Sequence, residues 1–182
     1  MQRIAQIANQ VNEKSSEDVV IVRALRTPLT RARKGAFKDT HAEFLLAAVL
    51  KEIVTGFDPK LVDDIQVGNV LPAAGGATVA RMAQLYAGFP STSSISTVNR
   101  QCSSGLQAVH YIASAIQNGT IDIGIGAGCE SMSLGYGPTA MPPSYNDDIL
   151  TNQLAADCLI PMGITSENVA KQFSISREKQ VF

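Results

Sequence analysis

One cysteine of this sequence stands where thiol chemistry is favoured. Cys102 lies in the stretch NRQCSSGLQAVHYIASAIQNG, residues 99–119, between a strand-like run and a helix-like pattern. A thiol in the first turn of a helix meets free backbone N–H groups and the positive end of the helix dipole. Both favour the thiolate, the nucleophilic form of cysteine. The placement favours an acyl-transferring nucleophile, although a free cysteine is also often a small buried hydrophobe.

The other two cysteines favour structural roles. Cys129 follows a strand-like run without a helix pattern behind it, and Cys158 stands in an apolar stretch, so we expect both in the core. Three widely spaced cysteines without a CxxC pair give no disulfide framework and indicate a reducing compartment. With only His41 and His110 available, the sequence shows no zinc-ligand spacing, and we expect no metal site.

Strand and helix patterns alternate from residue 18 onward. Alternation of this kind predicts an α/β fold with a mostly parallel sheet and helices on both faces. In such sheets ligand sites lie at the carboxyl ends of the strands, which is where Cys102 falls. The expected strands are residues 18–25, 65–71, 95–99 and 121–128, and the expected helices are residues 41–55, 78–89 and 103–118.

The expected helices carry apolar stripes that should face the sheet. Gly105, one turn into the helix after Cys102, would let another segment approach closely. The stripe residues are Leu106, Val109, Ala113 and Ile116 in that helix, and Leu45, Val49 and Ile53, with Leu46 and Leu50 beside them, in residues 41–55.

The composition of the sequence changes after Glu130. Residues 131–147 are rich in Gly, Pro and Ser and predict an irregular loop. Weakly helical residues 149–158 follow, then a helix that we expect to begin near Thr165 or Ser166. A last helix after Ser176 would have only six residues, which is marginal unless other groups hold it.

Composition excludes several classes of function. The 182 residues are 45% hydrophobic and 17% charged with a net charge of -1, which indicates a globular domain and argues against binding nucleic acid. The basic residues within 23–38 lack interleaved aromatic residues and are interpreted as a solvated loop. The longest apolar run, residues 44–50, is too short to span a membrane.

Several long motifs, in colinear order, resemble thiolases. They are NRQCSSGLQAV around Cys102, RTPLTRARKGAFKDT (26–40), GNVL (68–71), GIGAGCESMS (124–133) and CLIPMGITSENVA (158–170). The likeness is greatest to the peroxisomal 3-ketoacyl-CoA thiolase branch of the family. It implies the N-terminal half of the layered thiolase fold, incomplete here: residues 18–131 as a thiolase N-terminal domain and residues 132–182 as the start of a loop domain.

The resemblance also implies a reaction. In thiolases, the cysteine that corresponds to Cys102 accepts an acyl group from a 3-ketoacyl-CoA in fatty-acid β-oxidation, and its backbone N–H stabilises the oxyanion. Coenzyme A serves as a substrate, and no further cofactor is expected. Met162 matches a segment near the substrate. The family further implies CoA thioesters as ligands and a homodimer for the full-length protein.

The sequence departs from the family in its missing motifs. The Asn of an NEAF segment, the His of a GHP segment and the second, acid/base Cys have no counterpart here. We therefore expect the 182-residue chain alone to lack turnover. A biosynthetic acetoacetyl-CoA thiolase, a β-ketoacyl synthase with less well matched motifs, and a non-catalytic remnant that binds a full-length subunit are the alternatives.

Residues 1–17 carry a targeting pattern. Arg3-Ile4, five residues and then Gln10-Val11 resemble the type-2 peroxisomal signal, although Val11 departs from the usual last position. Ile4, Ile7 and Val11 fall at helical spacing, which suits a segment read by an import receptor. We expect a peroxisomal location rather than a mitochondrial or cytosolic one.

Overall fold

The chain divides into two compact units, Met1–Ala140 and Met141–Phe182. The computed structural model describes residues 15–137 and 140–181. The targeting pattern from Arg3 to Val11 lies outside the described residues. The domain limits expected after residues 17 and 131 remain predictions.

The first unit is built on a parallel sheet. Its three strands are β1 (Asp64–Gly68), β2 (Ser94–Val98) and β3 (Gly124–Gly128), in the order β2-β1-β3. Ile65 of β1 lies opposite Ile95 of β2 and Ile125 of β3. The central position of β1 explains why Ile65 and Val67 are completely buried, and the parallel pairing confirms the α/β prediction.

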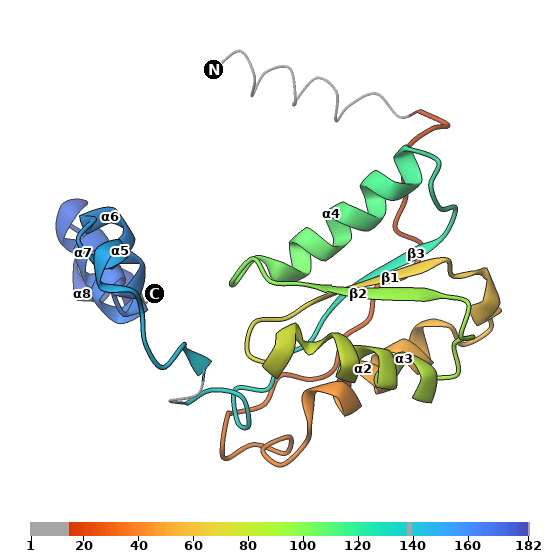
Figure 1. Ribbon diagram of the computed structural model, residues 1–182, viewed down its shortest axis with the longest axis horizontal. Coiled ribbons are helices and arrows are strands. Elements are labelled where there is room, and N and C mark those ends of the chain that lie inside the picture. The colour runs from red at the N-terminus through yellow and green to blue at the C-terminus, as the bar shows by residue number, and fades with distance from the viewer. Residues whose placement is uncertain (1–14, 138–139, 182) are drawn as a thin grey trace. The chain divides into compact units, whose positions relative to one another are not determined.

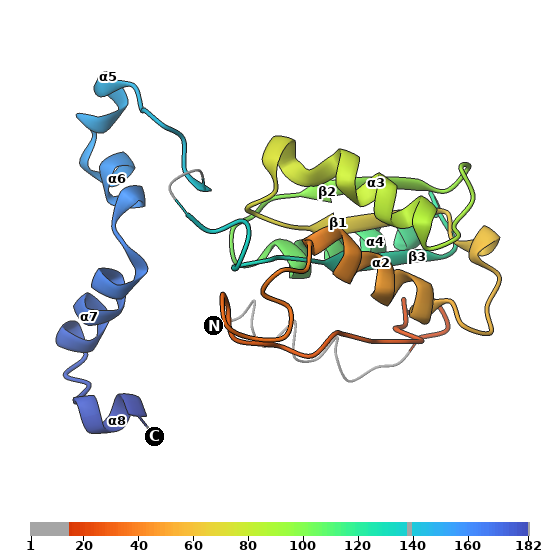
Figure 2. The ribbon, with the colours of Figure 1, turned by 90° about the horizontal axis from the view of Figure 1, so that it is seen from below.

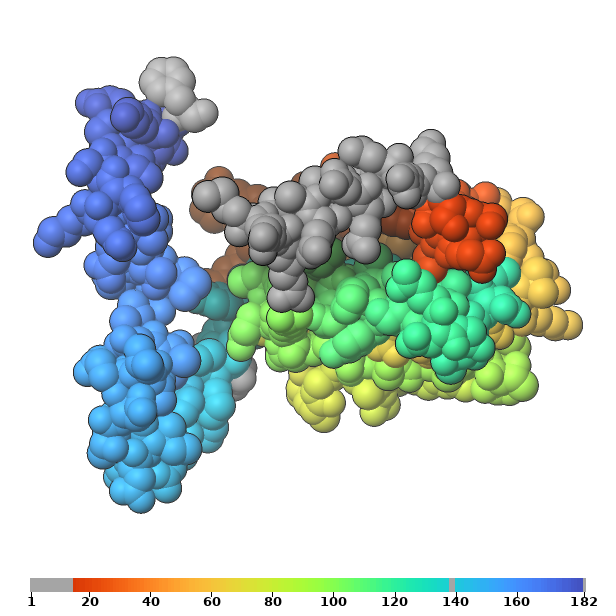
Figure 3. Space-filling model, turned by 90° about the horizontal axis from the view of Figure 1, so that it is seen from above, coloured from red at the N-terminus to blue at the C-terminus, as the bar shows by residue number. Residues whose placement is uncertain are grey.

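Helices cover both faces of this sheet (Figures 1 and 2). Helices α2 (Ala42–Ile53) and α3 (Ala77–Tyr86) pack together on one face. Helix α4 (Ser104–Gln117) lies along β1 and β3 on the other face. Figure 3 shows the side of the first unit on which α4, green to teal, forms the surface.

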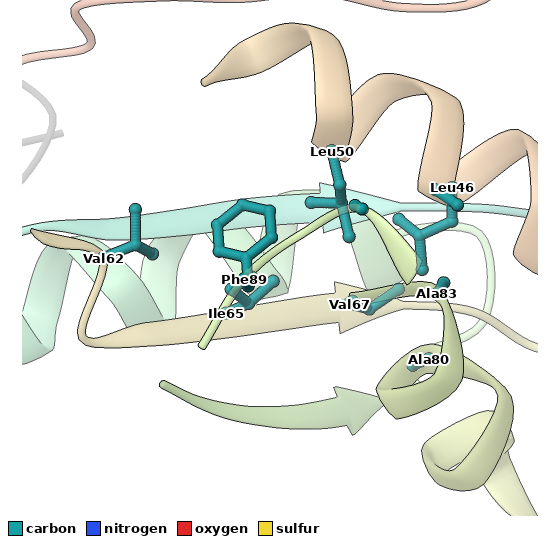
Figure 4. Packing of buried hydrophobic residues seen from close by; sticks show 10 residues of the cluster. Leu46, Leu50, Val62, Ile65, Val67, Ala80, Ala83 and Phe89 are labelled. Atoms are coloured by element: carbon teal, nitrogen blue, oxygen red, sulfur yellow. The ribbon is translucent and has the colours of Figure 1, made fainter. Parts of the chain in front are cut away.

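The core lies between the sheet and the α2–α3 pair (Figure 4). Leu46 and Leu50 of α2 pack with Ile65 and Val67 of β1 in one hydrophobic cluster, which also includes Phe89. Burying one such side chain stabilises the fold by about 1.5–3 kcal/mol.

The buried faces of α2 and α4 differ from the predicted stripes. In α2 the buried residues are Ala47 and the two leucines expected beside the stripe, Leu46 and Leu50, whereas the stripe itself is only half-buried. In α4 the buried residues are Ser104, Gln107, Ala108 and Ile112, while Leu106 is 73% exposed and Val109 is 38% exposed.

Glycines in β3 explain the altered face of α4. A Cβ at Gly126 would lie 2.6 Å from Cα of Val109, so the helix backbone rests directly on the strand. Gly124 likewise leaves room for Ile112, because a Cβ at Gly124 would lie 2.9 Å from that side chain. The part of α4 at Val109 and Ile112 therefore rests on β3, and Leu106 stays exposed.

The predicted strand over residues 18–25 does not form. The segment is extended, but Val20, Ile21 and Val22 are 70%, 77% and 91% exposed. It runs on the β3 side of the sheet (Figure 2), where no described strand pairs with the outer edge of β3. The prediction was wrong because β-branched residues form a strand only when a neighbouring strand satisfies their N–H and C=O groups.

Side chains hold the two long loops of the first unit. The Arg23 guanidinium donates to the carbonyls of Ile53 at 2.7 Å and Thr55 at 2.8 Å, at the end of α2. The basic loop that follows is mostly exposed, as predicted, and the Arg33 N–H donates to Ser133 Oγ at 2.9 Å. The Gly-rich stretch after β1 forms a short 3₁₀ turn over Ala73–Gly76, with Gly75 and Gly76 at positive φ.

The second unit consists of short helices: α5 (Asp147–Leu150), α6 (Gln153–Ala156), α7 (Met162–Gln172) and α8 (Arg177–Val181). Helix α7 begins at Met162, earlier than the predicted Thr165 or Ser166, because Pro161 can directly precede a first helical turn. The short helix after Ser176 is confirmed. Among the described residues, no helix has both the length and the apolar character that a membrane crossing requires.

Candidate active site

Cys102 lies in the turn that joins β2 to α4. Strand β2 ends at Val98, and α4 begins at Ser104 with Ser103 as its N-cap residue. Cys102 therefore stands just before the helix, not inside its first turn as predicted, and its side chain is exposed. The thiol is open to solvent at the carboxyl edge of the sheet.

The amino end of α4 is not capped by a side chain. The hydroxyl of Ser103 instead donates to the Arg100 carbonyl at 2.9 Å. The N–H of Ser104 donates to the Gln101 carbonyl at 3.0 Å. Within the part of the chain that the structure describes, the next N–H groups of the helix, those of Gly105 and Leu106, and its positive dipole end thus remain available to negative charge beside Cys102. Among the described residues, no donor forms a hydrogen bond to Cys102 Sγ.

The turn before Cys102 is tightly held. Gln101 has a φ of 50°, a left-handed conformation that residues other than glycine seldom adopt. Its N–H donates to Asn99 Oδ1 at 3.0 Å, and its carbonyl accepts the Ser104 hydroxyl at 2.6 Å. The same Ser104 Oγ accepts the N–H of Arg100 at 2.9 Å. These local bonds fix the backbone on both sides of Gln101.

The ends of β1 and β3 lie against this turn. The Asn99 amide donates to the Val70 carbonyl at 3.4 Å, just past β1. The Glu130 carboxylate, just past β3, accepts the N–H groups of Val70 at 2.8 Å and Leu71 at 3.4 Å. The sequence prediction missed Asn99 and Glu130. An Asn two residues before a turn N–H is a recognisable Asx-turn signal, but no local pattern marks Glu130.

Close approach in this region depends on Gly68. A Cβ at Gly68 would lie 2.3 Å from the carbonyl carbon of Ser104, so β1 and the start of α4 are nearly in backbone contact. The role predicted for Gly105 is not found, because a Cβ there would meet no atom within 4 Å. The glycine that allows the approach is on the strand and not on the helix.

The other two cysteines have contrasting surroundings. Cys129 is half-buried and packs against the core, in line with the prediction. Burial raises the pKa of the Cys129 thiol from 9.0 to about 11, and the charges of Glu130 and Glu43 add to the rise. Cys158, predicted for the core, is exposed, because the second unit buries little apolar surface around it.

Met162, the residue expected near the substrate, is exposed at the start of a helix. Met162 is the first residue of α7 in the second unit and is 70% exposed.

Within residues 15–137 and 140–181, no group of three or more His, Cys, Asp or Glu side chains is arranged to hold a metal ion. One surface hollow of the second unit is lined by residues between 167 and 180, and one of the first unit by residues 16–19 and 116–118. Cys102 lines neither of them.

The fold and the exposed cysteine define a class of protein: an α/β domain with a candidate thiol nucleophile before a helix at the carboxyl edge of a parallel sheet. A family description, thiolase N-terminal domain, matches residues 19–181. The chain belongs to the thiolase family.

Curated relatives agree with this assignment. Peroxisomal 3-ketoacyl-CoA thiolase B of Rattus norvegicus is 51% identical over 170 residues, 92% of this chain and 40% of that protein. Peroxisomal 3-ketoacyl-CoA thiolase 1 of Arabidopsis thaliana is 53% identical over 167 residues, 90% of this chain and 37% of that protein. The chain spans about 40% of the length of the rat relative.

Solved structures show the same fold. The dimeric peroxisomal thiolase of Saccharomyces cerevisiae matches with a TM-score of 0.87 and 45% identity, over 94% of this chain and 46% of that one. An acetyl-CoA acetyltransferase of Bacillus anthracis matches with a TM-score of 0.71 and 33% identity, over 90% of this chain and 44% of that one. The chain has the α/β fold of part of the layered thiolase structure.

Proposed function

We propose that this chain is the N-terminal part of a 3-ketoacyl-CoA thiolase, an acetyl-CoA C-acyltransferase of fatty-acid β-oxidation, and that Cys102 is its nucleophile. The main support is the exposed thiol directly before the uncapped amino end of α4, in a chain of the thiolase family. Identities near 50% to several peroxisomal 3-ketoacyl-CoA thiolases favour this activity over other thiolase reactions.

The reaction proceeds in two half-steps. The Cys102 thiolate attacks the 3-keto carbon, the bond between carbons 2 and 3 breaks, and acetyl-CoA leaves after its carbanion takes up a proton. The shortened acyl group is then a thioester on Cys102. The thiol of a second CoA loses its proton, attacks the acyl carbon and releases the Cys102 thiolate. The Cys102 backbone N–H and the start of α4 are suited to stabilise the oxyanion.

Coenzyme A is a substrate here, and the proposal includes no further cofactor. CoA and acyl-CoA thioesters are the expected small-molecule partners. Met162 is a candidate contact on the substrate side, supported by its exposure at the start of α7 and by the family motif around it. Nucleic acid and membrane lipid are not expected partners.

The proposed location is the peroxisome, supported by the names of the relatives from rat, Yarrowia lipolytica and Arabidopsis thaliana. The proposed partner for import is a receptor that binds the pattern from Arg3 to Val11. A homodimer is proposed for a full-length protein, because the similar yeast thiolase is dimeric.

The 182-residue chain alone is proposed to lack turnover. In the described residues, Cys102 Sγ neither donates nor accepts a hydrogen bond, so no side chain there is placed to take its proton. The test is incubation of the purified chain with acetoacetyl-CoA and CoA. We expect no multiple turnover in this mixture. With acetoacetyl-CoA alone, we expect an acetyl adduct on Cys102 in the intact-protein mass. Cys102→Ser should abolish the adduct, and Cys158→Ser should retain it.

A biosynthetic acetoacetyl-CoA thiolase is the alternative enzyme, supported by the 33% identity to the bacterial acetyltransferase. A non-catalytic remnant that binds a full-length subunit is the alternative from another class. The adduct experiment separates the remnant from the enzymes, because a remnant would leave Cys102 unmodified. Multiple turnover by the chain alone would contradict the proposed need for further residues.

A further inference from the structure

A series of hydrogen bonds connects the ends of all three strands to the residue before Cys102. The Glu130 carboxylate, after β3, accepts the N–H groups of Val70 at 2.8 Å and Leu71 at 3.4 Å, after β1. The Val70 carbonyl accepts the Asn99 amide at 3.4 Å, after β2. Asn99 Oδ1 accepts the Gln101 N–H at 3.0 Å. A displacement of Glu130 can therefore reach Gln101 through two intermediate residues.

Gln101 is the residue that needs such support. Its φ of 50° is unfavourable for a side chain that carries a Cβ, and such conformations persist only where surrounding contacts hold them. Asn99 holds Gln101 directly through its side-chain oxygen and is itself held through its side-chain nitrogen. Relaxation of Gln101 would turn the peptide that carries the Cys102 N–H and redirect the thiol.

Glu130 acts as a fixed anchor in this series. Its side chain is half-buried, and among the described residues no Lys, Arg or His forms an ion pair with it. Backbone N–H groups alone meet its negative charge, and charge-assisted bonds of this kind are stronger than neutral ones. The carboxylate thus fixes the segment after β1 more firmly than a neutral side chain would.

We propose that Glu130 and Asn99 are positioning residues for Cys102: they hold the left-handed turn at Gln101, and thereby the direction of the thiol and its N–H, without contacting substrate. The inference rests on the proposed role of Cys102 as the nucleophile. It extends that proposal to two residues that lie 28 positions after and 3 positions before the cysteine.

Asp63 provides a matched control at the opposite end of the same strands. Asp63 Oδ2, before β1, accepts the N–H groups of Asp122 at 3.0 Å and Ile123 at 3.2 Å, before β3. Asp63 and Glu130 each join β1 to β3 through one carboxylate and two N–H groups. Their removal should lower stability by similar amounts, but only Glu130 is connected to the turn at Gln101.

The experiment measures the alkylation of individual cysteines by iodoacetamide near neutral pH, with peptide mass spectrometry, alongside the melting temperature. Exposed Cys158 in the second unit serves as the internal reference. Glu130→Ala should lower the ratio of the Cys102 rate to the Cys158 rate about threefold or more, because the thiol loses its fixed place at the helix start. Glu130→Gln, which retains an acceptor oxygen, should restore most of the ratio, and Asp63→Ala should leave it unchanged.

Asn99→Ala is the second test variant, and it tests the positioning role even if Glu130→Ala does not fold. It should lower the ratio as Glu130→Ala does, and the double variant should show much less than the product of the two effects, because both act on one turn. Independent effects, or an equal change in Asp63→Ala, would overturn the proposal. Alkylation needs no thiolase turnover, so failure of this inference and failure of the proposed function are distinguishable.

Discussion

At the residue scale, three thiols of one chain have three different surroundings. Cys102 and Cys158 are both exposed, but only Cys102 adjoins the amino end of a long helix. Cys129 packs against the core beside the Glu130 carboxylate. An exposed thiol can react with reagents in solution, and the neighbouring backbone determines the direction in which the thiol points. The chemistry of a cysteine therefore follows from its position in the fold.

The Cys129 thiol should make stability depend on pH in the alkaline range. Its pKa is raised to about 11 in the folded chain by burial and by the carboxylates of Glu130 and Glu43, against an ordinary value of 9.0. As pH rises through this window, the unfolded chain releases the proton while the folded chain keeps it, so the free energy of unfolding decreases. Below about pH 9 this stabilising contribution is fully present.

Urea unfolding of the wild type and of Cys129→Ala at a series of pH values measures this contribution. The wild type should lose stability relative to the variant between about pH 9 and pH 11. The comparison with Cys129→Ala removes the titration of lysine and tyrosine, which both proteins share. A stability difference that does not change with pH over this range would contradict the expected titration.

At the element scale, the sequence predicted the helices and strands whose pattern is complete within a local window. Helices α2, α3 and α4 and strands β1, β2 and β3 lie where the hydrophobic periodicity and the Gly and Pro signals predicted them. The strand expected over residues 18–25 is absent because strand formation depends on a neighbour that local pattern does not reveal. The periodicity of α4 likewise did not show that strand glycines would rotate its buried face.

The candidate site could be predicted only in part for the same reason. Cys102 was found from its position at a strand-to-helix junction, although the helix begins two residues later. Glu130 acts through N–H groups 60 and 59 residues earlier in the sequence, and no local signal reports such a contact. The role of a residue such as Glu130 depends on tertiary contacts, and the periodicity and spacing of the sequence do not reveal these contacts.

The close packing of α4 on the sheet gives a prediction for two glycines. Gly68→Ala should destabilise the chain strongly, by about 1–3 kcal/mol, because a Cβ 2.3 Å from the Ser104 carbonyl carbon forces backbone apart. Gly105→Ala should be neutral or stabilise the chain by up to about 1 kcal/mol, because its Cβ would occupy open space in a helix. Thermal unfolding of both variants tests this, and comparable destabilisation by the two would disprove the described packing.

At the scale of the whole chain, the two compact units differ in how they are stabilised. The first has a continuous core of aliphatic and aromatic side chains between its sheet and α2–α3. In the second, Ala170 is the only buried hydrophobic residue among those described, and Leu154 and Phe173 are 80% and 66% exposed. Helices of 4 to 11 residues without a core are marginal by themselves.

Amide hydrogen exchange should therefore separate the two units of the chain. Amides of β1, whose Ile65 and Val67 are completely buried, should open only with the whole first unit. Amides of α7 should exchange at least about a hundredfold faster, because little burial opposes their local opening. Helix α2 is the control, since it is close to α7 in length but packs on the core. Protection of α7 equal to that of α2 would show that the second unit has stabilising contacts beyond those described.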